Sequence, residues 1–131
     1  MPNTAETLQA MTQAYVFEKD LCNKCAHLSK IAQPLESGFI NPTQDAKNKV
    51  EYLIFELADE DIRSHLDTQE KLDIVFLMRT LHHVAIGLSQ LHKAQIAHQD
   101  LKPSNVLIYN SGISSKICDL GRAWDKNIPA P

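Results

Sequence analysis

Glycine is scarce in this sequence of 131 residues, which holds only four glycines. Loops that cradle phosphate groups with backbone amides depend on closely spaced glycines. Gly38, Gly87, Gly112 and Gly121 are too far apart along the chain to build such a loop. The sequence therefore offers no glycine-rich phosphate-binding motif.

Cysteine is also rare, and the odd total of three argues against a framework of disulfides. Free thiols fit a reducing compartment, so we expect a cytoplasmic location. Cys22 and Cys25 have C-x-x-C spacing, with His27 close by. No second pair is present to complete four zinc ligands. We therefore interpret the two cysteines as apolar neighbours one helical turn apart rather than as half a zinc site or a redox pair.

Neither a strong net charge nor a long apolar run is present. The net charge is −3 and the pI is near 6.0, which gives no reason to expect nucleic acid or an anionic membrane as a partner. The N-terminal residues lack the basic-then-apolar order of a secretion signal. The apolar runs are too short to span a bilayer. With 44% apolar and 22% charged residues, the composition is that of a soluble globular domain without a membrane segment.

Four chemically active side chains lie within a stretch of about twenty residues, namely Asp100, Lys102, Asn105 and Asp119. Phosphoryl transfer requires a group that orients the attacking hydroxyl, positive charge on the transferred phosphoryl group and oxygen ligands for Mg²⁺. These four side chains supply all three requirements. The pattern therefore indicates phosphotransferase chemistry.

The order of these residues resembles the signature of eukaryotic-type protein kinases, H-R-D-L-x-x-x-N followed by D-F-G. The chain reads H-Q-D-L at 98–101 and D-L-G at 119–121, so Gln99 replaces the arginine and Leu120 replaces the phenylalanine. Lys102, with the proline after it, is similar to the serine/threonine kinases. Small-molecule phosphotransferases share the histidine, aspartate and asparagine but not this lysine.

The resemblance implies a role for each active residue. Asp100 would orient the substrate hydroxyl, and Lys102 would neutralise charge on the γ-phosphate. Asn105, counted with them as catalytic, would share Mg²⁺ with Asp119 as a hard oxygen ligand. Contacts with ATP are expected from Phe55, Glu56, Ala58, Lys102, Asn105, Leu107 and Asp119, where Glu56 and Ala58 would bind the adenine edge through their backbones.

The resemblance also implies an α+β fold that covers part of a kinase domain. We expect a partial domain over 14–131. Its first section, 14–57, would be a remnant of the small lobe with helix C and the hinge strand. Its second section, 58–131, would begin the helical large lobe and contain the catalytic loop. Residues 1–13 carry no strong pattern and are expected to be disordered.

Periodicity supports this division in the first section. Apolar residues at helical spacing predict a helix over 14–28, where Glu18 holds the position of the family's glutamate that pairs with a strand lysine. A strand interrupted by Pro34 is predicted over 31–40. The aromatic and branched run 50–57 predicts a buried strand.

In the second section, the acidic turn 59–61 is expected to cap a short helix over 62–66. Asp67 and Glu70 have capping-box spacing and predict the start of a long helix that ends near Lys93. Its apolar face is expected to comprise Leu72, Val75, Met78, Leu81, Ala85, Leu88 and Leu91.

A hairpin of strands 106–109 and 115–118 is expected to bring Asp119 back beside Asn105. The resemblance also implies that His98 and Leu120 pack inside the lobe instead of taking part in the reaction.

Several parts of the resembling family are missing from this sequence. No strand lysine precedes Glu18, and the chain ends before the A-P-E motif. We therefore expect an incomplete serine/threonine protein kinase that transfers phosphate weakly or not at all alone, unless a second chain completes it. Its expected partners are ATP, Mg²⁺ and a protein substrate. The alternatives are a pseudokinase-like module that binds nucleotide or a partner and, less favoured because of Lys102, a small-molecule phosphotransferase.

Overall fold

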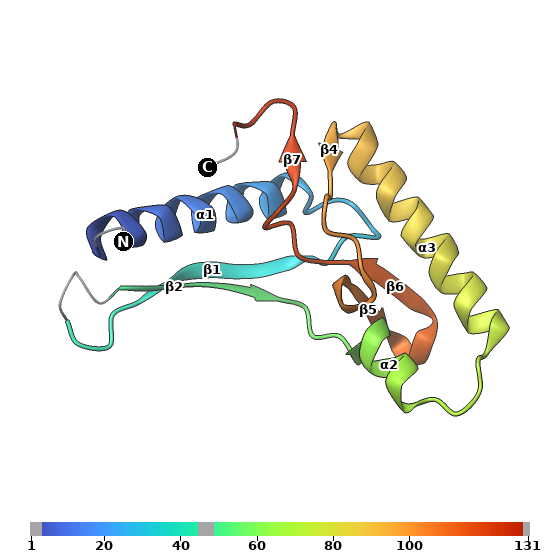
Figure 1. Ribbon diagram of the computed structural model, residues 1–131. Helices are drawn as coiled ribbons and strands as arrows, with labels where there is room; N and C mark the ends of the chain where they lie inside the picture. The colour runs from blue at the N-terminus through green and yellow to red at the C-terminus, as the bar shows by residue number, and fades with distance from the viewer. Residues whose placement is uncertain (1–3, 45–48, 130–131) are drawn as a thin grey trace.

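The computed structural model describes residues 4–44 and 49–129 and arranges them around a central junction (Figure 1). Helix α1 (Thr4–Lys24) lies along a hairpin of β1 (Pro34–Ile40) and β2 (Val50–Phe55). Helix α3 (Ile74–Lys93) lies on the other side, against a small sheet. The remaining elements are β3 (Glu60–Asp61), α2 (Ile62–Thr68), β4 (Ile96–Ala97), η2 (Pro103–Asn105), β5 (Val106–Tyr109), η3 (Asn110–Gly112), β6 (Ser114–Ile117) and β7 (Trp124–Asp125).

The strands form three small antiparallel sheets, as expected for an α+β fold. They pair as β1 with β2, as β3-β5-β6 in that order, and as β4 with β7. The predicted β5–β6 hairpin is present, with Val106 opposite Ile117 and Tyr109 opposite Ser114, and its second strand lies one residue earlier than the sequence predicts. A parallel bridge from Ile31 to Ile117 fastens the chain before β1 to the same sheet. The sheet thereby holds both halves of the chain together.

Helix α1 begins much earlier than the sequence pattern predicts. It starts at Thr4 instead of Ala14, so the expectation of disorder is wrong for residues 4–13, while residues 1–3 lie outside the described part. Residues 5–14 are exposed, because this end of the helix extends beyond the core. Since few of these residues are buried, the apolar periodicity used for prediction gives no signal there. The helix ends at Lys24, before the predicted end at Leu28.

The main core lies where the second half of α1 meets the end of α3 and the strands β4 and β6. Leu21, Leu91 and Ile117 are fully buried in it. The other buried members are Phe17, Cys22, Cys25, Ile31, Ile96, Leu120 and Ala123. Segments far apart in the sequence thus share one apolar cluster.

Strand β2 is not the buried strand that its composition predicts. Val50 and Ile54 are exposed, and on its partner β1 so are Leu35 and Phe39. Tyr15 of α1 covers one face, where its hydroxyl donates to backbone oxygens of both strands at 3.2 Å. Because the described residues form a sheet of only two strands here, the apolar side chains lack a further layer.

The predicted start of the long helix is also wrong. Helix α2 runs through Asp67 to Thr68, and α3 begins only at Ile74. Asp73 is the true N-cap, since its carboxylate accepts from the Phe76 amide at 3.1 Å. The predicted acidic cap of α2 is confirmed, because Asp61 accepts from the Ser64 amide at 2.8 Å.

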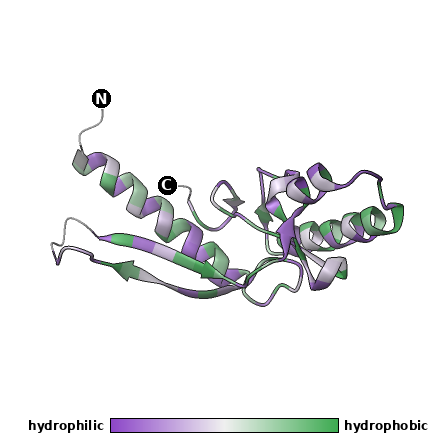
Figure 2. Ribbon diagram, turned by 90° about the horizontal axis from the view of Figure 1, so that it is seen from below, coloured by the Kyte–Doolittle hydropathy of each residue, from purple (hydrophilic) through white to green (hydrophobic). Residues whose placement is uncertain are grey.

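Helix α3 turns most of its predicted apolar face outward. Leu72, which lies just before it, and Val75, Met78 and Leu81 on it are all exposed, and Leu81 keeps 64% of its surface. The face that packs on the sheet carries Leu88 and Leu91, which were predicted, together with Thr80, Val84 and Gly87, which were not. The helix is therefore apolar on two sides. Figure 2 shows apolar residues in green along it.

By length and composition alone, α3 is long and apolar enough to cross a membrane. The lengths of the uninterrupted apolar runs in the sequence did not predict this. Core helices of soluble proteins meet the same criterion, so this finding is weak evidence for a membrane span.

Candidate active site

The loop between β4 and β5 is anchored by a buried histidine. The His98 ring is 2% exposed, its Nδ1 accepts from the Asp100 amide at 3.1 Å, and its Nε2 lies 2.8 Å from the carbonyl oxygen of Cys118. Since Nδ1 acts as an acceptor, the proton lies on Nε2, which donates to Cys118. His98 therefore joins the loop to the strand that carries Asp119, which confirms its structural role.

Asn105 makes a second link between the same two segments. Its Nδ2 donates to the Asp100 carbonyl at 2.9 Å and lies 3.4 Å from the Asp100 carboxylate. Its backbone oxygen accepts from the Cys118 amide at 2.9 Å. The hairpin thus brings the two predicted motifs together, as the sequence indicated.

Lys102 lies beside Asp100, with 3.8 Å between its Nζ and the nearer carboxylate oxygen. The lysine side chain is about half exposed, whereas the aspartate is mostly buried. At this separation the pair is loose, so the ammonium group remains free to approach another anion. The geometry is compatible with a cation that serves a phosphate group near Asp100.

Asp119 sits at a left-handed backbone position, with φ of 64°. Its carboxylate is exposed and accepts from the Gly121 amide at 3.1 Å. Glu18 of α1 reaches the same spot, since a β-carbon added to Gly121 would lie 2.8 Å from its Oε1. Burial, and then the negative charge of Asp119, raise the pKa of Glu18. Two carboxylates therefore crowd this point.

The donor set suits Mg²⁺. Asn105 uses its amide nitrogen toward Asp100, which leaves the amide oxygen as a ligand atom, and Asp119 is an exposed carboxylate that follows Cys118, whose amide bonds to the Asn105 carbonyl. Magnesium prefers hard oxygen ligands and is commonly held by one or two protein groups with water completing its shell. Within residues 4–44 and 49–129, no group of three or more His, Cys, Asp or Glu side chains forms a larger metal cluster.

The residues predicted to contact the adenine lie along the connector between β2 and β3. Phe55 is half-buried and packs against the main core. The Glu56 amide donates to the Gln33 carbonyl at 3.2 Å, and Ala58 follows in the connector. Leu107 lies on β5, paired with Asp61 and Lys116. Their contact with a nucleotide stays a prediction.

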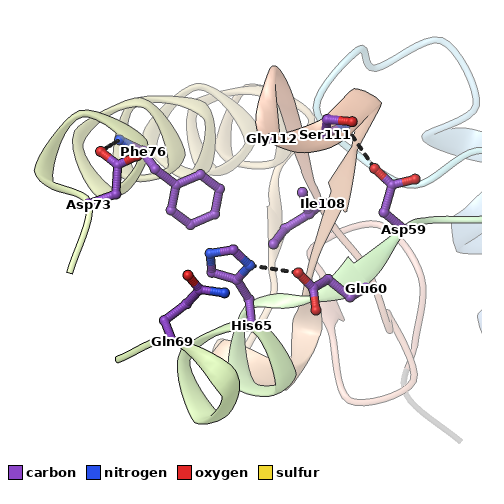
Figure 3. Close-up of a pocket in the computed structure, with 9 residues that line it drawn as sticks. All are labelled: Asp59, Glu60, His65, Gln69, Asp73, Phe76, Ile108, Ser111 and Gly112. Carbon is purple, nitrogen blue, oxygen red and sulfur yellow. Dashed lines mark hydrogen bonds and ion pairs between the residues drawn. The ribbon is translucent and has the colours of Figure 1, made fainter. Parts of the chain in front are cut away.

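A separate cavity of about 440 Å³ contains none of the predicted site residues (Figure 3). His65 stands at its centre, 2.6 Å from Glu60 Oε1 and stacked 4.5 Å from the Phe76 ring. The lining is Asp59, Glu60, His65, Gln69, Asp73, Phe76, Ile108, Ser111 and Gly112. These residues come from several elements, so no local motif in the sequence could have revealed the cavity.

An ion pair that sequence reasoning missed ties the segment after Gly121 to α1. Lys24 Nζ lies 2.6 Å from the carboxylate of Asp125, whose side chain is fully buried. Burial alone would raise the pKa of Asp125, but the Lys24 hydrogen bond and charge, together with the Asn127 amide at 2.8 Å, lower it overall. The aspartate is therefore held in its charged form.

The three cysteines are held as thiols. Burial, with Glu18 as the next cause, raises the pKa of Cys22 to about 12, and burial raises the pKa of Cys25 to about 11. Cys118 is half-buried, and burial followed by the charge of Asp119 raises its pKa to about 11. Cys22 and Cys25 belong to the core, as the apolar interpretation predicted. All three thiols are poor nucleophiles at neutral pH.

The chain belongs to the protein kinase family, because the model of the protein kinase domain matches residues 6–128. This confirms the resemblance to a partial eukaryotic-type serine/threonine kinase domain.

Individual relatives are mitogen-activated protein kinases. HOG1 of Eremothecium gossypii is 39% identical over 89 residues, which are 68% of this chain and 18% of that protein. Homolog 1 of Petunia hybrida is 39% identical over 82 residues, covering 63% of this chain and 21% of its own length. Mitogen-activated protein kinase 6 of Arabidopsis thaliana is 37% identical over 82 residues, which cover 63% of this chain and 20% of that protein. The chain thus spans about a fifth of the length of these relatives.

Proposed function

We propose that the chain carries the phosphate-transfer half of a serine/threonine protein kinase, which moves the γ-phosphoryl group of ATP to a protein hydroxyl. The observation that carries the proposal is Asn105, which joins the backbone and carboxylate of Asp100 to the strand that leads to Asp119. One buried residue, through its side chain and its backbone, would thereby hold the proposed base and the proposed metal ligands in a fixed relation. Preorganisation of this kind is the main contribution that a protein makes to phosphoryl transfer.

Each residue has a distinct part in the proposed reaction. Asp100 would orient the attacking hydroxyl and accept its proton, while Lys102 would offset charge on the transferred group. Asn105 and Asp119 would hold Mg²⁺, which supplies positive charge to the phosphates when bound. Gln99 is neutral, so it cannot pair with a phosphorylated loop as an arginine would. We therefore expect activity that does not depend on phosphorylation of the loop.

The described residues alone should transfer phosphate weakly. Glu18 and Asp119 both lie beside Gly121, and burial, followed by the negative charge of Asp119, raises the pKa of Glu18. A lysine from a further strand would relieve this repulsion. The exposed apolar residues of β1 and β2 could receive such a strand from a second chain or from a longer form of this protein.

The alternative is a pseudokinase-like module that binds nucleotide or a partner without transferring phosphate. The acidic crowding of Glu18 and Asp119 favours it, because a divalent cation would be attracted to the pair even where transfer is not completed. A small-molecule phosphotransferase is disfavoured by Lys102. We also propose a cytoplasmic location, which the three free cysteines support.

The test is a thermal melt of the 131-residue chain with and without Mg-ATP. Binding to the native state should raise the midpoint, and the rise should grow with ligand concentration. Asp119→Ala should abolish the rise, whereas Asp20→Ala, which removes an exposed acid on α1, should keep it. A cooperative melt that Mg-ATP leaves unmoved in the unsubstituted chain would overturn nucleotide binding. Where binding is found, phosphate transfer to a serine-containing protein separates the kinase from the pseudokinase.

A further inference from the structure

The connector between β2 and β3, residues 56–59, is held by hydrogen bonds at both of its ends. At the first end, the Glu56 amide donates to the Gln33 carbonyl at 3.2 Å, and the Gln33 amide donates back to the Glu56 carboxylate at 3.3 Å. At the second end, the Asp59 amide donates to the Ile108 carbonyl at 2.8 Å. The Asp59 carboxylate accepts from the Ser111 amide, also at 2.8 Å. Between these two ends, Leu57 projects into solvent.

Lys116 of β6 adds an ion pair to the hydrogen bonds at the first end of the connector. Lys116 Nζ lies 2.6 Å from Oε1 of Glu56, the same oxygen that accepts from the Gln33 amide. The side chains are 18% exposed for Lys116 and 28% for Glu56, so water screens the pair only in part. The ammonium group also lies 5.0 Å from the centre of the Tyr109 ring. Lys116 is thus held by a carboxylate and an aromatic face together.

The Gln33 side chain links the first end of the connector to the segment after α1. Its Nε2 donates to the carbonyls of Leu28 at 2.9 Å and Ile31 at 2.8 Å. Ile31 in turn bridges to Ile117, the neighbour of Lys116 on β6. Polar contacts therefore join the α1–β1 turn to the connector, the connector to β6, and β6 back to the turn. The Glu56 side chain contacts both the turn, through Gln33, and the sheet, through Lys116.

We propose that Lys116 is a positioning residue that clamps the connector through Glu56 and so fixes the backbone on which the adenine edge is expected to bind. The clamp itself follows from the contacts of the chain, while its effect on nucleotide affinity rests on the proposed function. Removing the ammonium group leaves the Glu56 carboxylate half-buried without its charge partner. The connector should then open more often, because a partly buried charge gains by moving into water.

The experiment follows amide hydrogen exchange in the full chain, read at Glu56 and Asp59. Lys116→Met keeps the length of the side chain and removes its charge. We expect exchange at the two amides to accelerate about tenfold, as local opening becomes easier. Glu56→Gln should act in the same direction, and Lys116→Arg should restore slow exchange. Unchanged exchange at both amides in Lys116→Met would overturn the clamp.

A matched control separates local opening from general loss of stability. Lys24→Met breaks another ion pair of 2.6 Å, located away from the connector. After correction for the global unfolding free energy, it should leave exchange at Glu56 and Asp59 unchanged. If exchange at these amides accelerates equally in Lys24→Met and Lys116→Met, Lys116 stabilises the fold in general and does not hold the connector, and the proposal is overturned.

A second readout is the affinity for Mg-ADP. Lys116→Met should weaken it about tenfold through loss of a preorganised backbone, and Lys116→Arg should recover it. If the unsubstituted chain does not bind Mg-ADP, the proposed function fails, and the exchange experiment still decides whether the clamp exists. Equal affinity in the unsubstituted and Lys116→Met chains, alongside faster exchange, would overturn the positioning of the adenine site.

Discussion

The central junction and the outlying arms of this molecule are built in opposite ways. At the junction, Leu21, Leu91 and Ile117 are fully buried, and the site loop is held by His98 and Asn105. In the arms, which are the β1–β2 hairpin and the first turns of α3, large apolar side chains are exposed. The junction buries its large apolar side chains, whereas the arms present apolar surfaces suited to further packing.

This contrast shows that the scaffold of the candidate site depends on few parts of the chain. The polar links among the two motifs come from residues 98–119 alone, and the apolar support comes from α1, α3 and β6. The arms contribute little to either. We therefore expect changes at the junction to affect folding and changes in the arms to affect association and solubility.

The largest expected effect is a cavity in the junction. Ile117→Ala should lower the free energy of unfolding by about 3–4 kcal/mol, because a fully buried isoleucine leaves both lost burial and an empty volume. Ile54→Ala in the hairpin, where the side chain is exposed, should cost less than about 1 kcal/mol. Urea unfolding of both variants measures the difference. Equal costs would contradict the division into junction and arms.

The next effect is loss of the ion pair between α1 and the segment after Gly121. Asp125→Ala should cost about 2 kcal/mol, less than for a fully buried pair because Lys24 is one-third exposed. The exposed pair of Arg63 and Asp67 should contribute no more than about 0.5 kcal/mol, which Arg63→Ala tests.

The pH dependence of the same pair has a definite sign. Because the pKa of Asp125 is lowered in the folded state, its contribution is present above the unfolded value near 3.8 and is lost as the pH falls through the folded value. Stability curves of the unsubstituted chain and Asp125→Ala should therefore converge in acid. If the two curves stay parallel down to the lowest accessible pH, the Lys24–Asp125 pair does not cause the pH dependence of stability.

A smaller effect of opposite sign is expected at Glu18. Its raised pKa means that its contribution is present below the unfolded value near 4.5 and is lost as the pH rises through the folded value. Glu18→Gln should therefore raise the thermal midpoint at pH 7 by about 2–4 °C and leave it unchanged at pH 4. Glu36→Gln on the exposed face of β1 serves as the control. A lower midpoint for Glu18→Gln at pH 7 would contradict the repulsion by Asp119.

The smallest effect concerns His83 of α3, whose Nδ1 accepts from the Ser115 amide at 3.2 Å. Burial, then the charges of Lys30, His82 and Arg79, lower its pKa. Its contribution is thus present above the unfolded value near 6.5 and is lost as the pH falls through the folded value. Between pH 7 and 5.5 we expect a loss of about 0.5 kcal/mol or less. His83→Gln should remove this slope, and His82→Gln, which removes one of its causes, should only reduce it, as denaturant melts at each pH would show.

The sequence predicted the junction better than the arms, for a physical reason. The β5–β6 hairpin and the cap at Asp61 depend on local patterns, and both are confirmed. The burial of His98 and Leu120, which the resemblance implied, is confirmed as well. The early part of α1 was missed because its residues are exposed and carry no periodicity. The boundary between α2 and α3 was misplaced because Asp67 and Asp73 are both suitable caps, and only the tertiary fold selects Asp73.

The orientation of α3 illustrates a further limit. Residues such as Met78 and Leu81 have the spacing of a core face, yet the helix packs through Thr80, Val84 and Gly87. When a helix is apolar on two sides, periodicity alone cannot tell which side the described residues cover. The ion pairs of Lys24 and Lys116 were likewise invisible, because their partners lie 101 and 60 positions away in the sequence.

The left-handed backbone at Gln99 and Asp119 bears on how this chain can change over generations. Glycine would adopt these angles at lower conformational cost than either residue, and asparagine would suit position 119 nearly as well as aspartate. Selection for stability alone would therefore favour glycine at these two sites. A lineage that keeps an acid at 119 retains the carboxylate against that preference, whereas one that has lost it has stopped using the group.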